Sequence, residues 1–193
     1  GGVARRMRER AQGRPVVMFA STFTERVSAA PHLHGAISEE IAKGGRYWLL
    51  TLHPKCPPEL FEKYRALAGE HALFVEPEQI VTAQRAADVL LSDTTSVVPE
   101  FVVQHKPVVT FRHRMPLDYM LDFSEVARLP QMLDRAFAPT PELRAAIIAY
   151  ANDIHPYRDG HSSERVVLAV EDLLAGRLGP LRPKPFMVRI RDL

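Results

Sequence analysis

Side chains that could bind or transform a ligand gather in four short polar segments of this sequence. Three of them directly follow short apolar runs, at residues 21–26, 53–55 and 92–96, and the fourth covers residues 155–165. Hydroxyl groups are frequent in these segments, together with histidine, lysine and arginine. Hydroxyls and cations donate hydrogen bonds to phosphate oxygens. The four segments are therefore candidates for contact with a ligand that carries phosphate.

The segment at residues 92–96 is the most informative, because it lies between an apolar run and an apolar helical segment. It consists of Ser92, Asp93, Thr94, Thr95 and Ser96. Thr95 or Ser96 suits the N-cap of that helix. The N–H groups and the dipole at such a helix end attract phosphate. These residues either cap the helix, hold a phosphate, or do both.

Two further segments follow the first and second apolar runs. Ser21 and Thr22 could hydrogen-bond phosphate or form part of an ordinary polar loop. The Gly-x-Gly-x-x-Gly fingerprint of NAD-binding proteins is absent there. His53 could contact phosphate or transfer a proton, and it could equally cap the turn before Pro54.

The fourth segment leads into a predicted helix. Asp159–Gly160 is typical of a turn, and Ser163 or the serine before it suits the N-cap. Arg165 falls in the first turn, where a cation is locally unfavourable beside the positive end of the helix dipole. A bound phosphate would offset that repulsion. The alternative is a surface arginine that pairs with Asp159 or Glu164.

The polar segments need a scaffold, and the rest of the sequence alternates between apolar runs and helical spacing. Buried strands are predicted at residues 16–20, 47–52, 72–75, 89–91 and 107–111. Helices are predicted at residues 33–43, 59–68, 78–85, 96–104, 129–137, 141–152 and 162–175. This alternation predicts an α/β fold with a doubly wound, Rossmann-like parallel sheet. In such a sheet ligands bind beyond the carboxyl ends of the strands, where the polar segments fall.

Composition limits this interpretation to a globular protein. The 193 residues are 46% hydrophobic and 25% charged, which suits one domain with at most a small appendage. The single cysteine, Cys56, excludes a disulfide framework and a cysteine-based zinc site. No apolar run approaches the roughly 20 residues of a membrane span, and no signal peptide follows Gly1. The chain lacks an initiating methionine, so we expect it to be part of a longer protein.

The net charge of +2 is unevenly distributed along the chain. Residues 1–14 and residues 177–193 each carry +4, which leaves −6 for the stretch between them. This distribution argues against a nucleic-acid-binding core, because such a core needs a basic face. We therefore divide the chain into a basic N-terminal segment (1–14), a Rossmann-like domain (15–176) and a Pro-rich basic tail (177–193). The two ends are either solvated tails or contacts to an anionic membrane surface or a missing domain.

Six motifs follow one another in a fixed order. They are Phe19–Phe23, His53–Pro54, Ala87–Val97, Glu100–Phe101, Lys106–Pro107 and Asp159–Val167. This set resembles the CDP-glycerol glycerophosphotransferase family, whose members build teichoic-acid and capsule-type polymers, and it spans residues 15–175. The sequence departs from the family at residues 93–96, where Asp-Tyr-Ser-Ser is usual, so the hydroxyls remain and the aromatic ring is lost. Glu100 replaces the more usual Asp, and His161 stands where Lys or Arg is common.

The resemblance implies the donor-binding half of a two-domain GT-B fold. Its implied activity moves a glycerol-phosphate or related alditol-phosphate unit from a CDP-activated donor to a hydroxyl of a cell-surface polymer, and releases CMP. The implied partners are a CDP-alditol or other nucleotide-diphosphate donor, and a polymer acceptor held through a missing N-terminal domain. Nucleic acid is not expected, nor are a cofactor or a metal, because helix dipoles and cations replace the metal in such enzymes. The expected location is cytoplasmic, with peripheral contact at the inner face of the membrane left open.

In this interpretation His53 is the catalytic candidate, through phosphate contact or proton transfer. Thr95 and Ser96 hold the diphosphate from one side, and Ser163 and Arg165 from the other. The other candidates for substrate binding are Ser21, Thr22, Asp93, Thr94, Asp159 and Gly160, of which Asp159 could instead fix its own loop.

Two other interpretations stay open. A nucleotide-sugar glycosyltransferase or a UDP-sugar 2-epimerase-like GT-B domain would more often have a glycine pair where this chain has residues 94–96. A non-catalytic α/β interaction module predicts that the Thr95, Ser96 and Arg165 side chains do not converge on one crevice.

Overall fold

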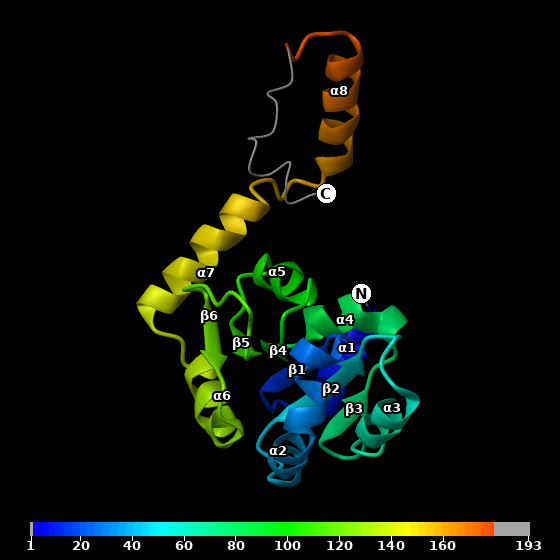
Figure 1. Ribbon diagram of the computed structural model, residues 1–193, viewed down its shortest axis with the longest axis vertical. Coiled ribbons are helices and arrows are strands. Elements are labelled where there is room, and N and C mark those ends of the chain that lie inside the picture. Colours follow the sequence, from blue (N-terminus) through cyan, green and yellow to red (C-terminus); the bar gives the residue numbers. More distant parts are fainter. Residues whose placement is uncertain (1, 180–193) are drawn as a thin grey trace. The chain divides into compact units, whose positions relative to one another are not determined.

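A six-stranded parallel sheet forms the centre of the computed structural model, which describes residues 2–179 (Figure 1). Its strands are β1 (Val16–Ser21), β2 (Tyr47–Leu52), β3 (Ala72–Phe74), β4 (Val89–Ser92), β5 (Val108–Phe111) and β6 (Met120–Phe123). The strand order is β3-β2-β1-β4-β5-β6, and every neighbouring pair is parallel. The predicted doubly wound sheet is therefore confirmed. The order reverses between β1 and β4, which makes their carboxyl ends the switch point.

Helices cover both faces of the sheet because its central strands are apolar on both sides. Val17 and Phe19 of β1 face α2 (Ala30–Ala42), α3 (Pro58–Arg65) and α6 (Leu129–Phe137). Val16 and Met18 face the opposite side, where α1 (Gly2–Ala11), α4 (Ile80–Ala86), α5 (Val97–Val102) and α7 (Pro141–Ile154) pack. Short 3-10 turns lie at Glu25–Val27, Pro77–Gln79 and Val126–Arg128. Figure 1 shows the two helical layers on either side of the strands.

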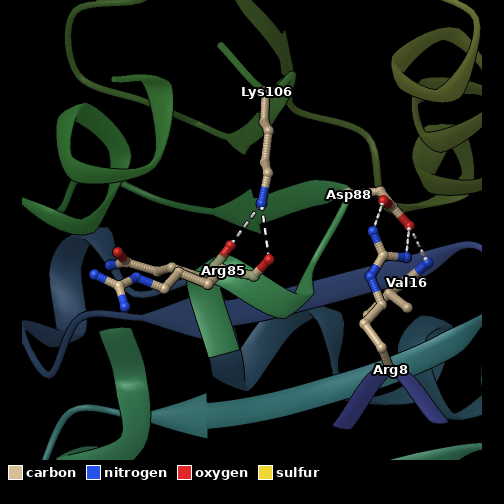
Figure 2. Close-up of polar contacts among 6 residues, drawn as sticks. Arg8, Val16, Arg85, Asp88 and Lys106 are labelled. Atoms are coloured by element: carbon tan, nitrogen blue, oxygen red, sulfur yellow. Dashed lines mark hydrogen bonds and ion pairs between the residues drawn. The ribbon is translucent and has the colours of Figure 1, made fainter. Parts of the chain in front are cut away.

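The basic N-terminal segment, residues 1–14, is not a solvated tail in its described part. Residues 2–11 form α1, which packs against α4 and buries Met7 and Ala11. The Arg8 guanidinium donates two hydrogen bonds to the Asp88 carboxylate, one of them 2.7 Å long (Figure 2). The same carboxylate accepts the backbone N–H of Val16 at 2.9 Å. The carboxylate thus joins α1 to the starts of β1 and β4, and residues 2–11 belong to the domain that we expected to begin at residue 15.

Several element ends differ from the sequence expectation for identifiable reasons. The helix ending before Gly44 is confirmed, and Gly44 has the positive φ of 68° that favours glycine after a helix. We missed β6 because its four residues include Asp122, which breaks the apolar pattern. The helix predicted at residues 96–104 is only the six-residue α5, and its N-cap Ser96 makes no side-chain capping bond. At α8 (Ser162–Leu174) the N-cap is His161, so the expected serine cap was wrong.

The chain divides into two compact units, Gly1–Ile154 and His155–Leu193. The first holds the sheet and helices α1 to α7. The second contains α8, on which no residue is buried. Most of the predicted basic tail, residues 180–193, lies outside the described residues. No helix within residues 2–179 is long and apolar enough to cross a membrane.

Candidate functional site

A pocket of about 210 Å³ opens at the carboxyl edge of the sheet, beside the switch point. It is lined by residues of β1 and β2, by the loop after β2, by the 3-10 turn after β3 and the first residue of α4, and by the β4–α5 loop and the first residue of α5. These are Ala20, Ser21, Thr51, Leu52, His53, Pro54, Pro77, Ile80, Thr95 and Val97. Three predicted site residues, Ser21, His53 and Thr95, therefore meet at one pocket. Parallel strands bring them together because all the carboxyl ends lie at the same edge.

Thr51 is a pocket residue that the sequence analysis missed. Its side chain is 1% exposed, and its hydroxyl has no hydrogen-bond partner among residues 2–179. A buried hydroxyl without a partner costs free energy, which makes Thr51 a candidate for a hydrogen bond to a ligand or water. The available signal was a threonine in the otherwise apolar run of residues 47–52.

His53 presents one defined face of its ring. Its Nδ1 accepts the backbone N–H of Lys55 at 3.1 Å. In the neutral ring the proton is therefore on Nε2, which has no hydrogen-bond partner in the described part of the chain. Phe23 packs against the ring with 4.4 Å between centroids, and the Lys55 ammonium lies 5.3 Å from the Phe23 ring. This arrangement makes His53 a hydrogen-bond donor through Nε2.

Asp93 and Ser21 form a buried hydrogen-bonded cluster beside the pocket. The Asp93 carboxylate accepts the Ser21 hydroxyl at 2.5 Å, the Ala29 N–H at 2.8 Å and the Thr22 N–H at 3.1 Å. The Ser21 oxygen accepts the Ala30 N–H at 3.1 Å. Together they cap α2, which therefore begins at Ala30 rather than at the predicted residue 33.

The environment of Asp93 opposes its ionisation. Burial raises the pKa of the Asp93 carboxyl above its ordinary value, and the hydrogen bonds from Ser21, Ala29 and Thr22 pull it back only in part. The carboxylate is fully buried, and each of its oxygens already accepts a bond. Asp93 and the Ser21 hydroxyl thus hold the loops of the site in place.

The hydroxyls of residues 92–96 have different surroundings. Ser92 is fully buried and donates to the Ala20 carbonyl at 2.7 Å. Thr94 accepts the backbone N–H of Arg114 at 3.0 Å, and Thr95 accepts the Val97 N–H at 3.5 Å. Thr94 and Thr95 are half-buried and Ser96 is exposed. Thr95 and Ser96 are the hydroxyls of this loop that remain most available to a ligand.

The other predicted residues belong to the second unit and are described by themselves. The Arg165 guanidinium donates two hydrogen bonds to Asp159, one of them 2.8 Å long, and lies 4.0 Å from the Tyr157 ring centroid. This pairing with Asp159 is the alternative that the sequence left open. The bonds from Arg165 hold the pKa of Asp159 well below its usual range. Gly160 has a positive φ of 81°, as the predicted turn requires, and Ser163 lies in the first turn of α8.

Within residues 2–179, no three His, Cys, Asp or Glu side chains gather in a way that could hold a metal ion. The groups at the carboxyl edge that can meet an anion are hydroxyls, imidazoles and cationic side chains.

Comparisons with known proteins place this geometry in a fold. No protein-family profile and no curated protein sequence matches the chain. The H548A variant of the wall teichoic acid polymerase TagF matches with a TM-score of 0.63 and 16% identity, over 92% of this chain and 48% of TagF. S. aureus MnaA, solved with UDP, matches with a TM-score of 0.61 and 14% identity, over 93% and 51% of the two chains.

A third match covers a single domain almost completely. It is the C-terminal CMP-Kdo binding domain of WaaA from Acinetobacter baumannii, with a TM-score of 0.54, 13% identity, and coverage of 79% of this chain and 97% of that domain. The chain has the fold of one half of a GT-B enzyme. This GT-B half-domain spans about half the length of TagF and of MnaA. At such identities the likeness establishes the fold, and the chemistry has to be argued from the site.

Proposed function

We propose that this GT-B half-domain binds the nucleotide donor of a transferase that moves a glycerol-phosphate or related alditol-phosphate unit. The donor is a CDP-alditol, the acceptor is a hydroxyl of a cell-surface polymer, and CMP is released. The acceptor would be held by a second GT-B half. The six motifs noted above favour this family, and the similarity in fold to TagF supports it.

The observation that carries the proposal is the 210 Å³ pocket at the switch point. It combines an apolar lining with a few polar groups, which is the usual composition of a small-molecule site. His53 and Thr95 lie on its rim with hydrogen-bonding groups suited to phosphate oxygens. Thr51 adds an unpartnered hydroxyl inside. An apolar pocket beside phosphate-binding groups fits a nucleotide better than it fits a protein surface.

The reaction in this proposal is a displacement at phosphorus. The acceptor hydroxyl attacks the β-phosphorus of the donor, a new P–O bond forms, and the bond to the bridging oxygen breaks. CMP leaves with that electron pair, and the hydroxyl proton passes to a base. Catalysis of this type consists mainly of positioning and of stabilising the developing charge.

The residues of this chain act on the donor side of that reaction. The Nε2–H of His53 donates to a phosphate oxygen, where it stabilises the leaving CMP. Neutral His53 has no free lone pair for the hydroxyl proton, because Nδ1 already accepts the Lys55 N–H. We therefore assign His53 to phosphate contact and the base to the acceptor half. Thr95 and Ser96 hold the same phosphates.

Calorimetric titration of the chain tests this proposal. CDP-glycerol and CDP-ribitol are expected to bind more tightly than CMP, and UDP-GlcNAc is expected not to compete. His53→Gln should weaken CDP-glycerol binding roughly tenfold, the effect of one hydrogen bond to a charged group, with less effect on cytidine. His34→Gln, on α2 and away from the pocket, is the matched control. The absence of saturable cytidine-nucleotide binding would refute the proposal.

A UDP-sugar enzyme is the second candidate, because MnaA and a UDP-N-acetylglucosamine 2-epimerase from Listeria monocytogenes share the fold at comparable TM-scores. The same titration separates the two. Tight binding of UDP-GlcNAc, with weak binding of CDP-glycerol, would favour this candidate over the glycerol-phosphate donor.

A further inference from the structure

The loop after β5, residues 112–116, lies at the same edge of the sheet as the pocket, yet it supplied none of the predicted site residues. It begins where β5 pairs with β4, whose Ser92 lies opposite Thr110. The backbone N–H of Arg114 donates to the Thr94 hydroxyl at 3.0 Å. The loop therefore touches the hydroxyl-rich segment that we expect to hold phosphate.

An uncommon backbone conformation directs this loop. Arg112 has a φ of 52°, the left-handed region that non-glycine residues rarely adopt. Its N–H donates to the Phe123 carbonyl at 2.9 Å, and its Nε donates to the Ser124 carbonyl at 3.2 Å. These bonds to β6 and the residue after it hold Arg112, and the chain then turns so that Arg114 reaches the β4 loop. Such strained residues are frequent at ligand sites.

His113 is held in the same way as His53. Its backbone N–H donates to the Asp122 carboxylate at 3.0 Å, and its Nδ1 accepts the N–H of Met115 at 3.1 Å. The proton of the neutral ring is therefore on Nε2, for which residues 2–179 provide no hydrogen-bond partner. His113 lies close enough to Asp93 for its positive charge to favour the ionised carboxylate.

The Arg114 guanidinium of this loop is accessible to a ligand. Arg114 is exposed, and its guanidinium has no polar partner in the described part of the chain. Asp122, on the neighbouring strand β6, already accepts the Thr110 hydroxyl at 2.7 Å as well as the His113 N–H. Adjacent strands lie about 4.8 Å apart, so an anion above the end of β4 lies within side-chain reach of the β5 loop. From there it also faces β2 and His53 across β1.

We propose that His113 and Arg114 form a second hydrogen-bonding contact for the donor diphosphate, on the far side of the β4 loop from His53. This inference rests on the proposed function, and it names residues that the motif resemblance does not include. The Nε2–H of His113 and the Arg114 guanidinium donate to phosphate oxygens. The Arg114 guanidinium balances part of the negative charge of the two phosphates, and the His113 Nε2–H adds a hydrogen bond.

Imidazole NMR of the ¹⁵N-labelled chain tests the contact with inorganic pyrophosphate as the probe. Pyrophosphate is expected to shift the Nε2 resonances of both His53 and His113. Arg114→Gln should weaken pyrophosphate binding about tenfold, and Arg114→Lys should restore part of the loss. Arg85→Gln is the matched control, because Arg85 is an exposed arginine at the far end of α4 (Figure 2), and it should change binding less than twofold.

The outcomes separate this inference from the proposed function. If CDP-glycerol binds and shifts His53 while His113 stays unmoved, the diphosphate contact is wrong and the function stands. If pyrophosphate shifts both histidines but CDP-glycerol does not bind, the contact stands and the function is wrong. No response to pyrophosphate, or equal losses in the Arg114→Gln and Arg85→Gln chains, overturns the inference.

Discussion

Replacing Asp93 by Asn tests whether the buried Asp93–Ser21 cluster stabilises the domain. The carboxylate accepts one hydroxyl and two backbone N–H groups, from Ser21, Thr22 and Ala29. The Asn amide keeps the shape but offers one acceptor oxygen, and its NH₂ group then faces the Thr22 N–H. A buried donor left unpaired costs about 1–3 kcal/mol, so we expect the free energy of unfolding to fall by about 2 kcal/mol.

The pH dependence of this loss follows from the pKa of Asp93, which burial raises above its ordinary value. Between the ordinary and the raised pKa, the folded chain keeps a proton that the unfolded chain has released. The stability that Asp93 contributes is therefore complete at low pH, and it declines as the pH rises through the raised pKa. Asn does not titrate, so the difference in free energy of unfolding between the natural chain and Asp93→Asn should become smaller from pH 4 to pH 8.

Urea unfolding followed by Trp48 fluorescence measures the loss in free energy of unfolding and its dependence on pH. Trp48 is the single tryptophan of the sequence and is fully buried on β2. Asp118→Asn, at an exposed position, is the control and should change the free energy of unfolding by less than about 0.5 kcal/mol. An unchanged stability in Asp93→Asn would refute the capping argument. A gap that widens with rising pH would refute the direction of the pKa shift.

The remaining predictions concern three single side chains. Thr51→Val removes the unpartnered hydroxyl, so it should raise the free energy of unfolding of the unliganded chain by about 1 kcal/mol in urea and weaken nucleotide binding. A lower free energy of unfolding would show that the hydroxyl has a partner. Tyr64→Phe removes the hydrogen bond to the Ala30 carbonyl, 2.9 Å long, and should cost about 1 kcal/mol. Because burial raises the pKa of Tyr64, the hydroxyl should stay protonated in a spectrophotometric titration up to pH 11, and ionisation near pH 10 would contradict its burial. Arg165→Ala should weaken diphosphate binding more than cytidine binding in calorimetry, whereas equal losses would indicate a structural role.

The sheet was predictable because its central strands carry apolar residues on both faces, as in Val16–Ala20 and Tyr47–Leu52. That pattern depends only on local sequence. β6 escaped prediction because it has only four residues and Asp122 interrupts its apolar pattern. We did not predict helix α1, because five of its ten residues are charged and only two, Met7 and Ala11, are buried in the domain.

The spacing of apolar residues along the sequence is enough to predict the α/β alternation, and with it the edge of the sheet where polar side chains gather. Position at a strand end is a local property, so Ser21, His53 and Thr95 could be named in advance. Tertiary structure alone decided what each group does there. Asp93 was predicted to contact a ligand, but it caps α2 through Ala29, which is 64 residues away in sequence. The β5 loop carried no motif, yet its Arg114 N–H donates to Thr94. Hydrogen bonds between distant segments depend on how strands are ordered in space, and no local pattern encodes that order.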